Sequence, residues 1–296
     1  MRLLDTSTAC RAEVTDLRLA RGEVHLWWIR LAASRAAAAR IEKMLSADET
    51  LRAAGFAFDD DRSAFILRRG VLRAVLASYL GSPAKDLLFE CGPQGKPALA
   101  GCPLVFNSSH SQGTALIAVT TCGEVGVDIE RLRPLNDAGS IAQRFFTAAE
   151  YTDWLSVSSG LRTEAFFNCW TRKESFVKAI GSGLSTPLDS FRVSLAPNEP
   201  AALLEVNGSA HAAEKWSMLD VKGDPNFAGC VAVNSSRGQS ANTKMFRMDS
   251  VEMCFESLER PTRHRLSPFV VNAPDREMIR AGNEEPSSTN LGENYG

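Results

Sequence analysis

Residues 170–185 read WTRKESFVKAIGSGLS, and they continue a helical pattern that begins at Thr163. At 3.6 residues per turn, the large side chains of this segment form one apolar stripe: Phe166, Trp170 and Val177. Lys173 falls inside the same stripe. A lysine in that position rarely lies buried without a partner, so its ammonium must either escape to solvent or meet an anion.

Glu174 and Lys178 are four residues apart and neighbour each other beside the apolar stripe. The simplest interpretation is a surface Glu–Lys pair. The alternative is a binding site, because a carboxylate flanked by Lys173 and Lys178 on one helix edge suits a place that holds both a metal ion and phosphates.

A second motif, VGVDIE at residues 125–130, predicts a strand with two carboxylates on one face. Residues two apart in a strand share a face, so Asp128 and Glu130 point the same way. Two like charges this close repel unless a cation lies between them. One or two carboxylates completed by phosphate and water are the ligands that Mg²⁺ prefers. The alternative is a strand with a solvated outer face.

Two shorter segments contain groups that suit a phosphate. In Gly95-Lys96-Pro97 the glycine and proline predict a tight turn that presents Lys96. The segment FNSSHS at residues 106–111 reads as a serine-rich turn around His110, with hydroxyl and backbone donors. A single histidine in a turn is more often structural than catalytic.

The remaining patterns predict an α+β fold. We expect a helical stretch before Ala54, and a helix at 63–80 that ends at Gly81. We also expect helices at 141–155 and 163–180. Alternation and turn signals predict strands at 24–31, 87–90, 104–107, 114–121, 124–130, 191–195, 202–205, 216–221 and 227–233.

This order predicts two similar α+β halves that meet near residues 122–125, with a ligand between them. The expected divisions are an N-terminal extension at 1–20, a first half at 21–124 and a second half at 125–237. Residues 238–296 are expected to be a largely disordered tail, although residues 245–258 also fit an amphipathic helix.

The bulk properties exclude some partners. A formal net charge of −2 gives no general attraction to nucleic acid or to an anionic membrane. No run of eighteen apolar residues and no signal-peptide core is present. The cysteines are odd in number and lack the C-x-x-C spacing, which favours a reducing compartment over disulfides or structural zinc. We therefore expect a cytoplasmic protein, and a monomer.

Taken together and in this order, the motifs resemble the Sfp-type 4′-phosphopantetheinyl transferases. The resemblance covers residues 45–233 and rests most on RFFTAAEY at 144–151 and on WTRKESFVKAIGSGLS. It implies two halves related by a pseudo-twofold axis, with coenzyme A bound in the cleft between them. The implied activity is Mg²⁺-dependent transfer of 4′-phosphopantetheine from coenzyme A to a serine of an apo acyl or peptidyl carrier protein, as used in fatty-acid, polyketide and nonribosomal-peptide synthesis.

Carried over position by position, the resemblance assigns roles to individual residues. It implies that Mg²⁺ is held by Asp128, Glu130 and Glu174. Glu174, Lys178 and His110 take the catalytic roles, and Glu174 activates the acceptor serine. The implied coenzyme A-binding residues are Arg52, Lys96, Pro97, Ser109, His110, Lys173 and Lys178. Glu150 matches an acidic position that lies near the site in some members.

The segment upstream of these motifs departs from the family pattern. Family members often carry several basic residues there for the 3′-phosphate of coenzyme A, whereas this chain has Glu49 and Gly55. Arg52 and Arg62 remain.

Two other functions also fit the residues. A Mg²⁺-dependent nucleotide pyrophosphohydrolase would use the same carboxylates and lysines, with water as the acceptor. A coenzyme A-binding or carrier-binding module without turnover is the second alternative.

Overall fold

The computed structural model describes residues 17–121, 123–234 and 242–259. Helices and strands are mixed along the chain, which confirms the α+β class. The first half comprises β1 (Glu23–Arg30), α1 (Arg35–Glu42), α2 (Ala47–Ala54), α3 (Asp59–Leu80), β2 (Phe89–Cys91), β3 (Pro97–Leu99), β4 (Val105–Ser111) and β5 (Thr114–Thr120). The second half comprises β6 (Glu124–Arg131), α4 (Ala138–Phe145), α5 (Ala148–Ser156), α6 (Arg162–Ile180), β7 (Phe191–Val193), β8 (Leu203–Val206), α7 (Ala210–Ala213), β9 (Trp216–Asp220) and β10 (Phe227–Asn234).

The two halves repeat one order of elements. Each runs from a strand through helices to a long helix, a short hairpin and two further strands. The long helices α3 and α6 both end at a glycine with a left-handed backbone, Gly81 at φ 64° and Gly181 at φ 69°. The sheets also match, with strand orders β1-β5-β4 and β6-β10-β9.

The chain beyond the second half returns to the first. Strand β11 (Asn242–Met248) pairs in parallel with β1, and helix α8 (Val251–Glu259) follows it. Buried side chains of both elements, including Phe246 and Phe255, join the core of the first half. The expected tail therefore does not begin at 238, because residues 242–259 are folded. Residues 1–16, 235–241 and 260–296 of the expected extension and tail lie outside the described residues.

Several predicted elements change their bounds or type. The segment FNSSHS lies within strand β4, and the tight turn comes after it, at Gln112 and Gly113, which both have positive φ angles. The turn expectation is therefore wrong, because Asn107, Ser109 and Ser111 alternate along a strand and bond to β6 of the other half. The single helix expected at 141–155 is two helices, α4 and α5, with Thr147 capping the second.

The core has three parts. One lies between the first sheet and helices α1, α3 and α8, and a second surrounds α6 in the other half. The third joins the halves, because side chains of β1 and β5, such as Trp28 and Leu116, pack against Val127 and Ile129 of β6. Every described helix is too short or too polar to cross a membrane.

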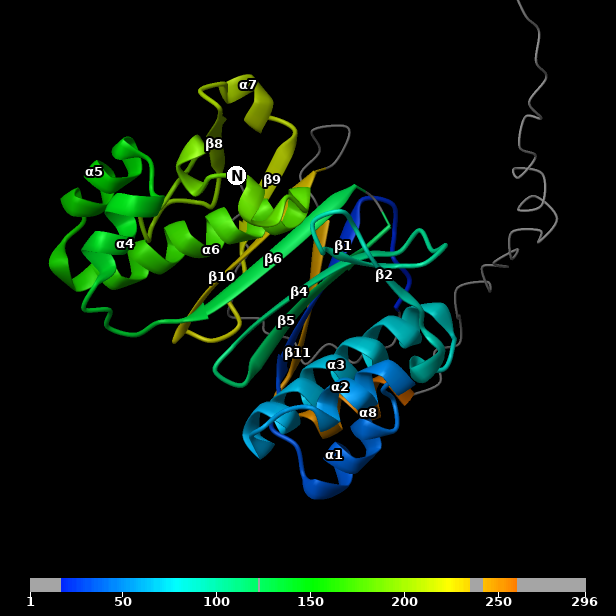
Figure 1. Cartoon of the computed structure of the whole chain (residues 1–296). Coiled ribbons are helices and arrows are strands. Elements are labelled where there is room, and N and C mark those ends of the chain that lie inside the picture. The colour runs from blue at the N-terminus through cyan, green and yellow to red at the C-terminus, as the bar shows by residue number, and fades with distance from the viewer. Residues whose placement is uncertain (1–16, 122, 235–241, 260–296) are drawn as a thin grey trace, which may run out of the picture.

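Strands β4 and β6 are the edges of their sheets, and they lie side by side where the two halves meet (Figure 1). Side chains of β4 join them. The Asn107 amide oxygen accepts a hydrogen bond from the Val127 backbone N–H at 2.9 Å, and the Ser111 hydroxyl accepts one from the Arg131 N–H at 3.1 Å. Polar side chains thus replace the ladder that backbone groups would form within one sheet.

Helix α6 packs unusually close to β6, and Gly126 makes this contact possible. A Cβ atom at Gly126 would lie 2.1 Å from the Ser175 carbonyl oxygen and 2.3 Å from the Ala179 backbone nitrogen. Both are backbone atoms of α6, so a side chain at Gly126 would push the whole helix away from the strand.

We predict that Gly126→Ala lowers the free energy of unfolding by about 3 kcal/mol, because the backbone of α6 cannot yield locally. Gly139→Ala on α4 is the matched control, since nothing lies within 4 Å of a Cβ there. The control should leave stability unchanged or raise it by up to about 1 kcal/mol through helix propensity. Chemical denaturation measures both variants, and equal effects from the two would contradict this account of the α6–β6 contact.

Candidate active site at the junction of β6 and α6

Asp128 lies on β6 at the point where α6 and β4 converge. Its carboxylate is almost fully buried, which rules out the solvated outer face considered above. One oxygen, Oδ1, accepts hydrogen bonds from the Lys178 ammonium at 2.6 Å and from the Ser109 hydroxyl at 2.7 Å. The other oxygen, Oδ2, is buried without a hydrogen-bond partner among the described residues.

Glu130 and Glu174 complete the set of acidic side chains. The Glu130 carboxylate, half-buried on β6, accepts a hydrogen bond from the Ser111 hydroxyl at 2.9 Å. Glu174 lies on α6, one turn before Lys178. Lys178 forms its ion pair with Asp128 from the neighbouring strand. The simple Glu174–Lys178 surface pair is therefore not the arrangement found.

The three carboxylates affect one another electrostatically. Burial raises the pKa of each above its ordinary value. The negative charge of Asp128 raises the pKa of Glu130 and of Glu174 further, and Glu130 also raises that of Glu174. Lys178 and Ser109 only partly offset the cost at Asp128. A cation placed among these groups would relieve the repulsion.

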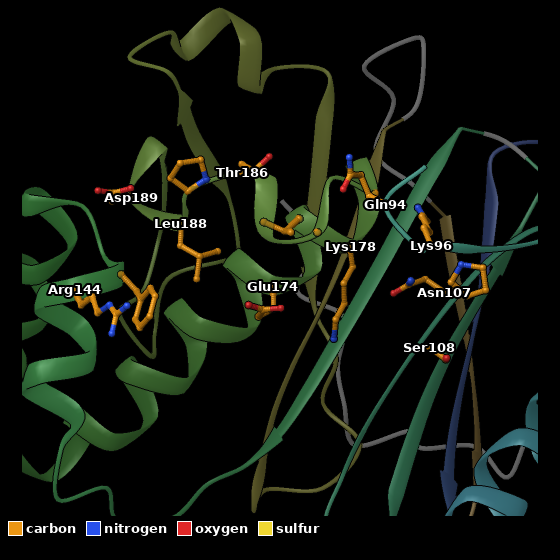
Figure 2. Close-up of a pocket in the computed structure, with 17 residues that line it drawn as sticks. Gln94, Lys96, Asn107, Ser108, Arg144, Glu174, Lys178, Thr186, Leu188 and Asp189 are labelled. Atoms are coloured by element: carbon orange, nitrogen blue, oxygen red, sulfur yellow. The ribbon is translucent and has the colours of Figure 1, made fainter. Parts of the chain in front are cut away.

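A cavity of about 540 Å³ opens beside Glu174 and Lys178. In Figure 2 these two side chains lie between Arg144 of α4 on one side and Asn107 and Ser108 of β4 on the other. The remaining lining residues are Gln94, Gly95, Lys96, Pro97, Phe145, Val177, Gly181, Gly183, Thr186, Pro187, Leu188 and Asp189. The cavity is thus lined by both halves, with charged and apolar side chains together.

The strand geometry of β4 separates Ser109 from His110. Ser109 is buried against Asp128, whereas the side chain of His110 is exposed. Partial burial lowers the pKa of His110, and the charges of Arg68 and Lys178 lower it further. His110 therefore lies in a positive environment that would attract an anion.

Lys96 and Pro97 lie at the cavity, but the Lys96 ammonium is already engaged. It donates to the Val125 carbonyl at 3.0 Å and to the Ala179 carbonyl at 2.7 Å. Lys96 thus ties the first half to both β6 and α6. In this arrangement its ammonium faces backbone oxygens and is not presented to a ligand.

The ligand contact predicted for Lys173 is wrong. Its side chain is fully buried, and its ammonium lies 2.7 Å from the Glu150 carboxylate and from the carbonyls of Leu188 and Phe191. Glu150 is also fully buried and accepts a hydrogen bond from the Val193 N–H. The lysine in the apolar stripe does meet an anion, as one of the two alternatives predicted, but that anion is an internal carboxylate of the second half.

The upstream charged residues lie on helices of the first half. The Glu49 carboxylate is buried between Arg69 and Arg73 of α3; burial alone would raise its pKa, but hydrogen bonds from the two arginines lower it. Arg52 stacks on the Phe65 ring, and Arg62 pairs with Glu42 at 3.2 Å. Arg52 and Arg62 are not among the described residues that line the cavity.

Sequence reasoning missed three contributors. Asn107 and Ser111 hold β6 beside β4, and Arg144 faces the cavity from α4. A strand interpretation of FNSSHS would have found the first two, because Asn107, Ser109 and Ser111 alternate and share a face.

Comparison with known proteins matches residues 124–231 to the 4′-phosphopantetheinyl transferase superfamily. The 4′-phosphopantetheinyl transferase HetI of Nostoc is 38% identical over 222 residues, which cover 74% of this chain and 90% of HetI. The 4′-phosphopantetheinyl transferase Sfp of Bacillus subtilis is 34% identical over 157 residues, which cover 53% of this chain and 69% of Sfp.

Among solved structures, the holo-[acyl-carrier-protein] synthase of Thermotoga maritima matches 38% of this chain and 64% of its own, at 22% identity and a TM-score of 0.32. This likeness is too weak to bear on the fold. The match to HetI extends over nearly all of that protein and includes the β6 and α6 residues that form the site. The chain therefore belongs to the Sfp-type 4′-phosphopantetheinyl transferases.

Proposed function

We propose that this enzyme moves 4′-phosphopantetheine from coenzyme A to the hydroxyl of a serine in an apo carrier protein, and that it needs Mg²⁺. The observation that carries the proposal is the junction of β6 and α6. There Lys178 pairs with the buried Asp128, burial raises the pKa of Asp128, Glu130 and Glu174, and Glu174 and Lys178 line a cavity formed by both halves. Family membership indicates the transfer reaction, and we propose that it takes place at the junction of β6 and α6.

The residues at the junction fit a magnesium ion by their chemistry. Within the described ranges, no three His, Cys, Asp or Glu side chains are already gathered around a common point. However, Asp128 Oδ2 is buried without a hydrogen-bond partner among the described residues, burial raises the pKa of all three carboxylates, and Asp128 repels both Glu130 and Glu174. Carboxylate oxygens are the ligands that Mg²⁺ prefers. We assign the ion to Asp128, Glu130 and Glu174, where it would neutralise charge on the pyrophosphate oxygens.

The transfer itself is a displacement at phosphorus. The serine oxygen attacks the β-phosphorus of coenzyme A, the bond to the bridging oxygen breaks, and adenosine 3′,5′-bisphosphate leaves. Glu174 takes the serine proton directly or through a water. Its raised pKa makes the carboxylate a better base than an exposed glutamate, and it lines the cavity that the acceptor must enter.

Positive side chains around the junction would hold the donor. Lys178 lies on α6 and His110 on β4. The two are close enough for the charge of Lys178 to lower the pKa of His110. We propose that both contact the coenzyme A phosphates. In transfers of this kind, most of the catalysis comes from positioning and charge stabilisation.

The carrier protein must bring its serine to Glu174, and we propose that it docks on residues 134–146. Arg144 and Phe145 of this segment line the cavity, so α4 lies beside it. Leu135 and Ile141 are only partly buried against the second core, whereas Phe146 is fully part of it. The segment is thus partly core and partly available surface. Reduced hydrogen exchange of α4 on addition of an apo carrier would support this docking site.

We propose a cytoplasmic location. The cysteines that the structure describes are all free thiols, as expected in a reducing compartment: Cys91, Cys102, Cys169, Cys230 and Cys254.

Intact-protein mass spectrometry tests the proposed reaction directly. An apo carrier is mixed with the enzyme, coenzyme A and Mg²⁺, and a parallel sample contains a chelator. We expect the carrier to gain the mass of the phosphopantetheine arm only when the metal is available. Breakdown of coenzyme A with an unchanged carrier mass would indicate a pyrophosphohydrolase. Unchanged masses of both would indicate a binding module.

Replacing Glu174 should lower the activity of the enzyme and raise its stability. We predict that Glu174→Gln lowers kcat/KM by about a hundredfold, because the proton acceptor is lost. The same change should raise the free energy of unfolding of the metal-free protein near neutral pH. The raised pKa means that the ionised form opposes folding above the ordinary pKa, and the amide has no charge to bury.

Glu256→Gln on the exposed face of α8 is the matched control and should change neither quantity. Transfer at the parental rate by Glu174→Gln would remove Glu174 from the mechanism.

Mg²⁺ should stabilise the protein in a pH-dependent way. We predict that Mg²⁺ at ten times its Kd raises Tm by about 3 °C near neutral pH, since binding to the folded state alone favours that state. The rise should be smaller at about pH 5, because protons then compete for carboxylates with raised pKa values. Differential scanning fluorimetry measures the shift. An equal shift in Asp128→Asn would show that the ion binds elsewhere.

A further inference from the structure

Lys178 contacts the carboxylate that the proposed function assigns to a cation. Its ammonium lies 2.6 Å from Asp128 Oδ1 and 3.2 Å from the Ser109 hydroxyl. Ser109 itself donates to the same carboxylate oxygen at 2.7 Å. The ammonium, the hydroxyl and the carboxylate therefore form a closed triangle at one side of Asp128.

The contacts of this triangle involve only one of the two carboxylate oxygens of Asp128, Oδ1. Asp128 is buried, and its Oδ2 atom has no hydrogen-bond partner within the described part of the chain. A buried carboxylate is costly unless its charge is compensated, and one ammonium at one oxygen compensates it incompletely. Glu174 and Glu130 add negative charge nearby, so the junction holds more negative charge than Lys178 can neutralise.

A divalent ion and the Lys178 ammonium compete for this place. Both carry positive charge, and the repulsion between them is strong at a site that water screens poorly. The Lys178 side chain can also move its ammonium away from Asp128. Its side chain is about 30% exposed, it extends on a flexible four-carbon stem, and it lines the cavity together with Asn107 and Ser108 of β4 (Figure 2).

We propose that Lys178 stands in for the metal ion in the empty enzyme and that ion binding displaces its ammonium from Asp128 into the cavity. The inference rests on the proposed function, since it takes Asp128 as a metal ligand. Ser109 is the positioning residue that holds Lys178 in the empty state. The displacement couples two binding events, because the ammonium released by the ion becomes available to an anionic donor in the same cavity.

This coupling has a thermodynamic consequence. If the ion frees Lys178 for the donor, the ion must tighten binding of an anion and the anion must tighten binding of the ion by the same factor. Without Lys178 the ion no longer has to displace an internal cation. Lys178→Met should therefore bind Mg²⁺ about tenfold more tightly in the absence of coenzyme A, while losing the coupling between the two ligands.

Two measurements on the full-length protein without coenzyme A test the inference. The first is NMR of ¹⁵N-labelled lysine side chains during a Mg²⁺ titration, with the Lys178 ammonium assigned by its absence in Lys178→Met. The second is calorimetry of Mg²⁺ binding to the wild type, to Lys178→Met and to Lys215→Met. Lys215 is exposed and precedes β9, so its replacement removes the same charge away from the junction.

We expect the Lys178 signal to shift during the titration with the Kd that calorimetry gives. We also expect tighter Mg²⁺ binding in Lys178→Met and no change in Lys215→Met. If the wild type binds Mg²⁺ but the Lys178 signal stays fixed, or if Lys178→Met binds it with unchanged affinity, the displacement is refuted. Loss of Mg²⁺ binding in Asp128→Asn would then show that the metal assignment survives without the displacement. If the wild type binds no Mg²⁺, the metal assignment fails and the displacement fails with it.

Discussion

Helix α6 lies directly against strand β6 because Gly126 has no side chain between them. The residues on either side of this contact are the ones that we assign to the site. Asp128 follows Gly126 by two positions on the strand, and Glu174 and Lys178 directly precede Ser175 and Ala179 on the helix. Backbone contact in the middle of the two elements thus fixes the distance between acidic groups that are far apart in the sequence.

The same packing creates an electrostatic cost that the fold only partly offsets. Burial raises the pKa of the three carboxylates at the junction, repulsion from Asp128 raises the pKa of Glu130 and Glu174 further, and Lys178 offsets these effects only partly. The Glu150–Lys173 pair in the second core provides a contrast, because its ammonium is surrounded by three oxygen atoms. The fully compensated Glu150–Lys173 pair stabilises the second half. The incompletely compensated carboxylates at the junction are where a bound cation would stabilise the protein most.

Local sequence patterns were enough to predict the parts of the site that lie on one element. The period of two in VGVDIE placed Asp128 and Glu130 together, and the helical period placed Glu174 beside Lys178. Contacts between elements were harder to predict. Lys173 and Lys178 have the same charge on the same helix, and only burial by β7 and α5 shows which one is structural. The parallel pairing of β11 with β1 is likewise invisible in a polar segment more than 200 residues downstream.

Crystals grown with Mn²⁺ and coenzyme A would test the gathering of these carboxylates most directly, because Mn²⁺ accepts similar oxygen ligands and its anomalous scattering locates it without ambiguity. We predict one strong anomalous peak that Asp128, Glu130 and Glu174 all coordinate, beside the coenzyme A phosphates. A peak bound elsewhere, or a bound coenzyme A with no metal at these three side chains, would contradict the account.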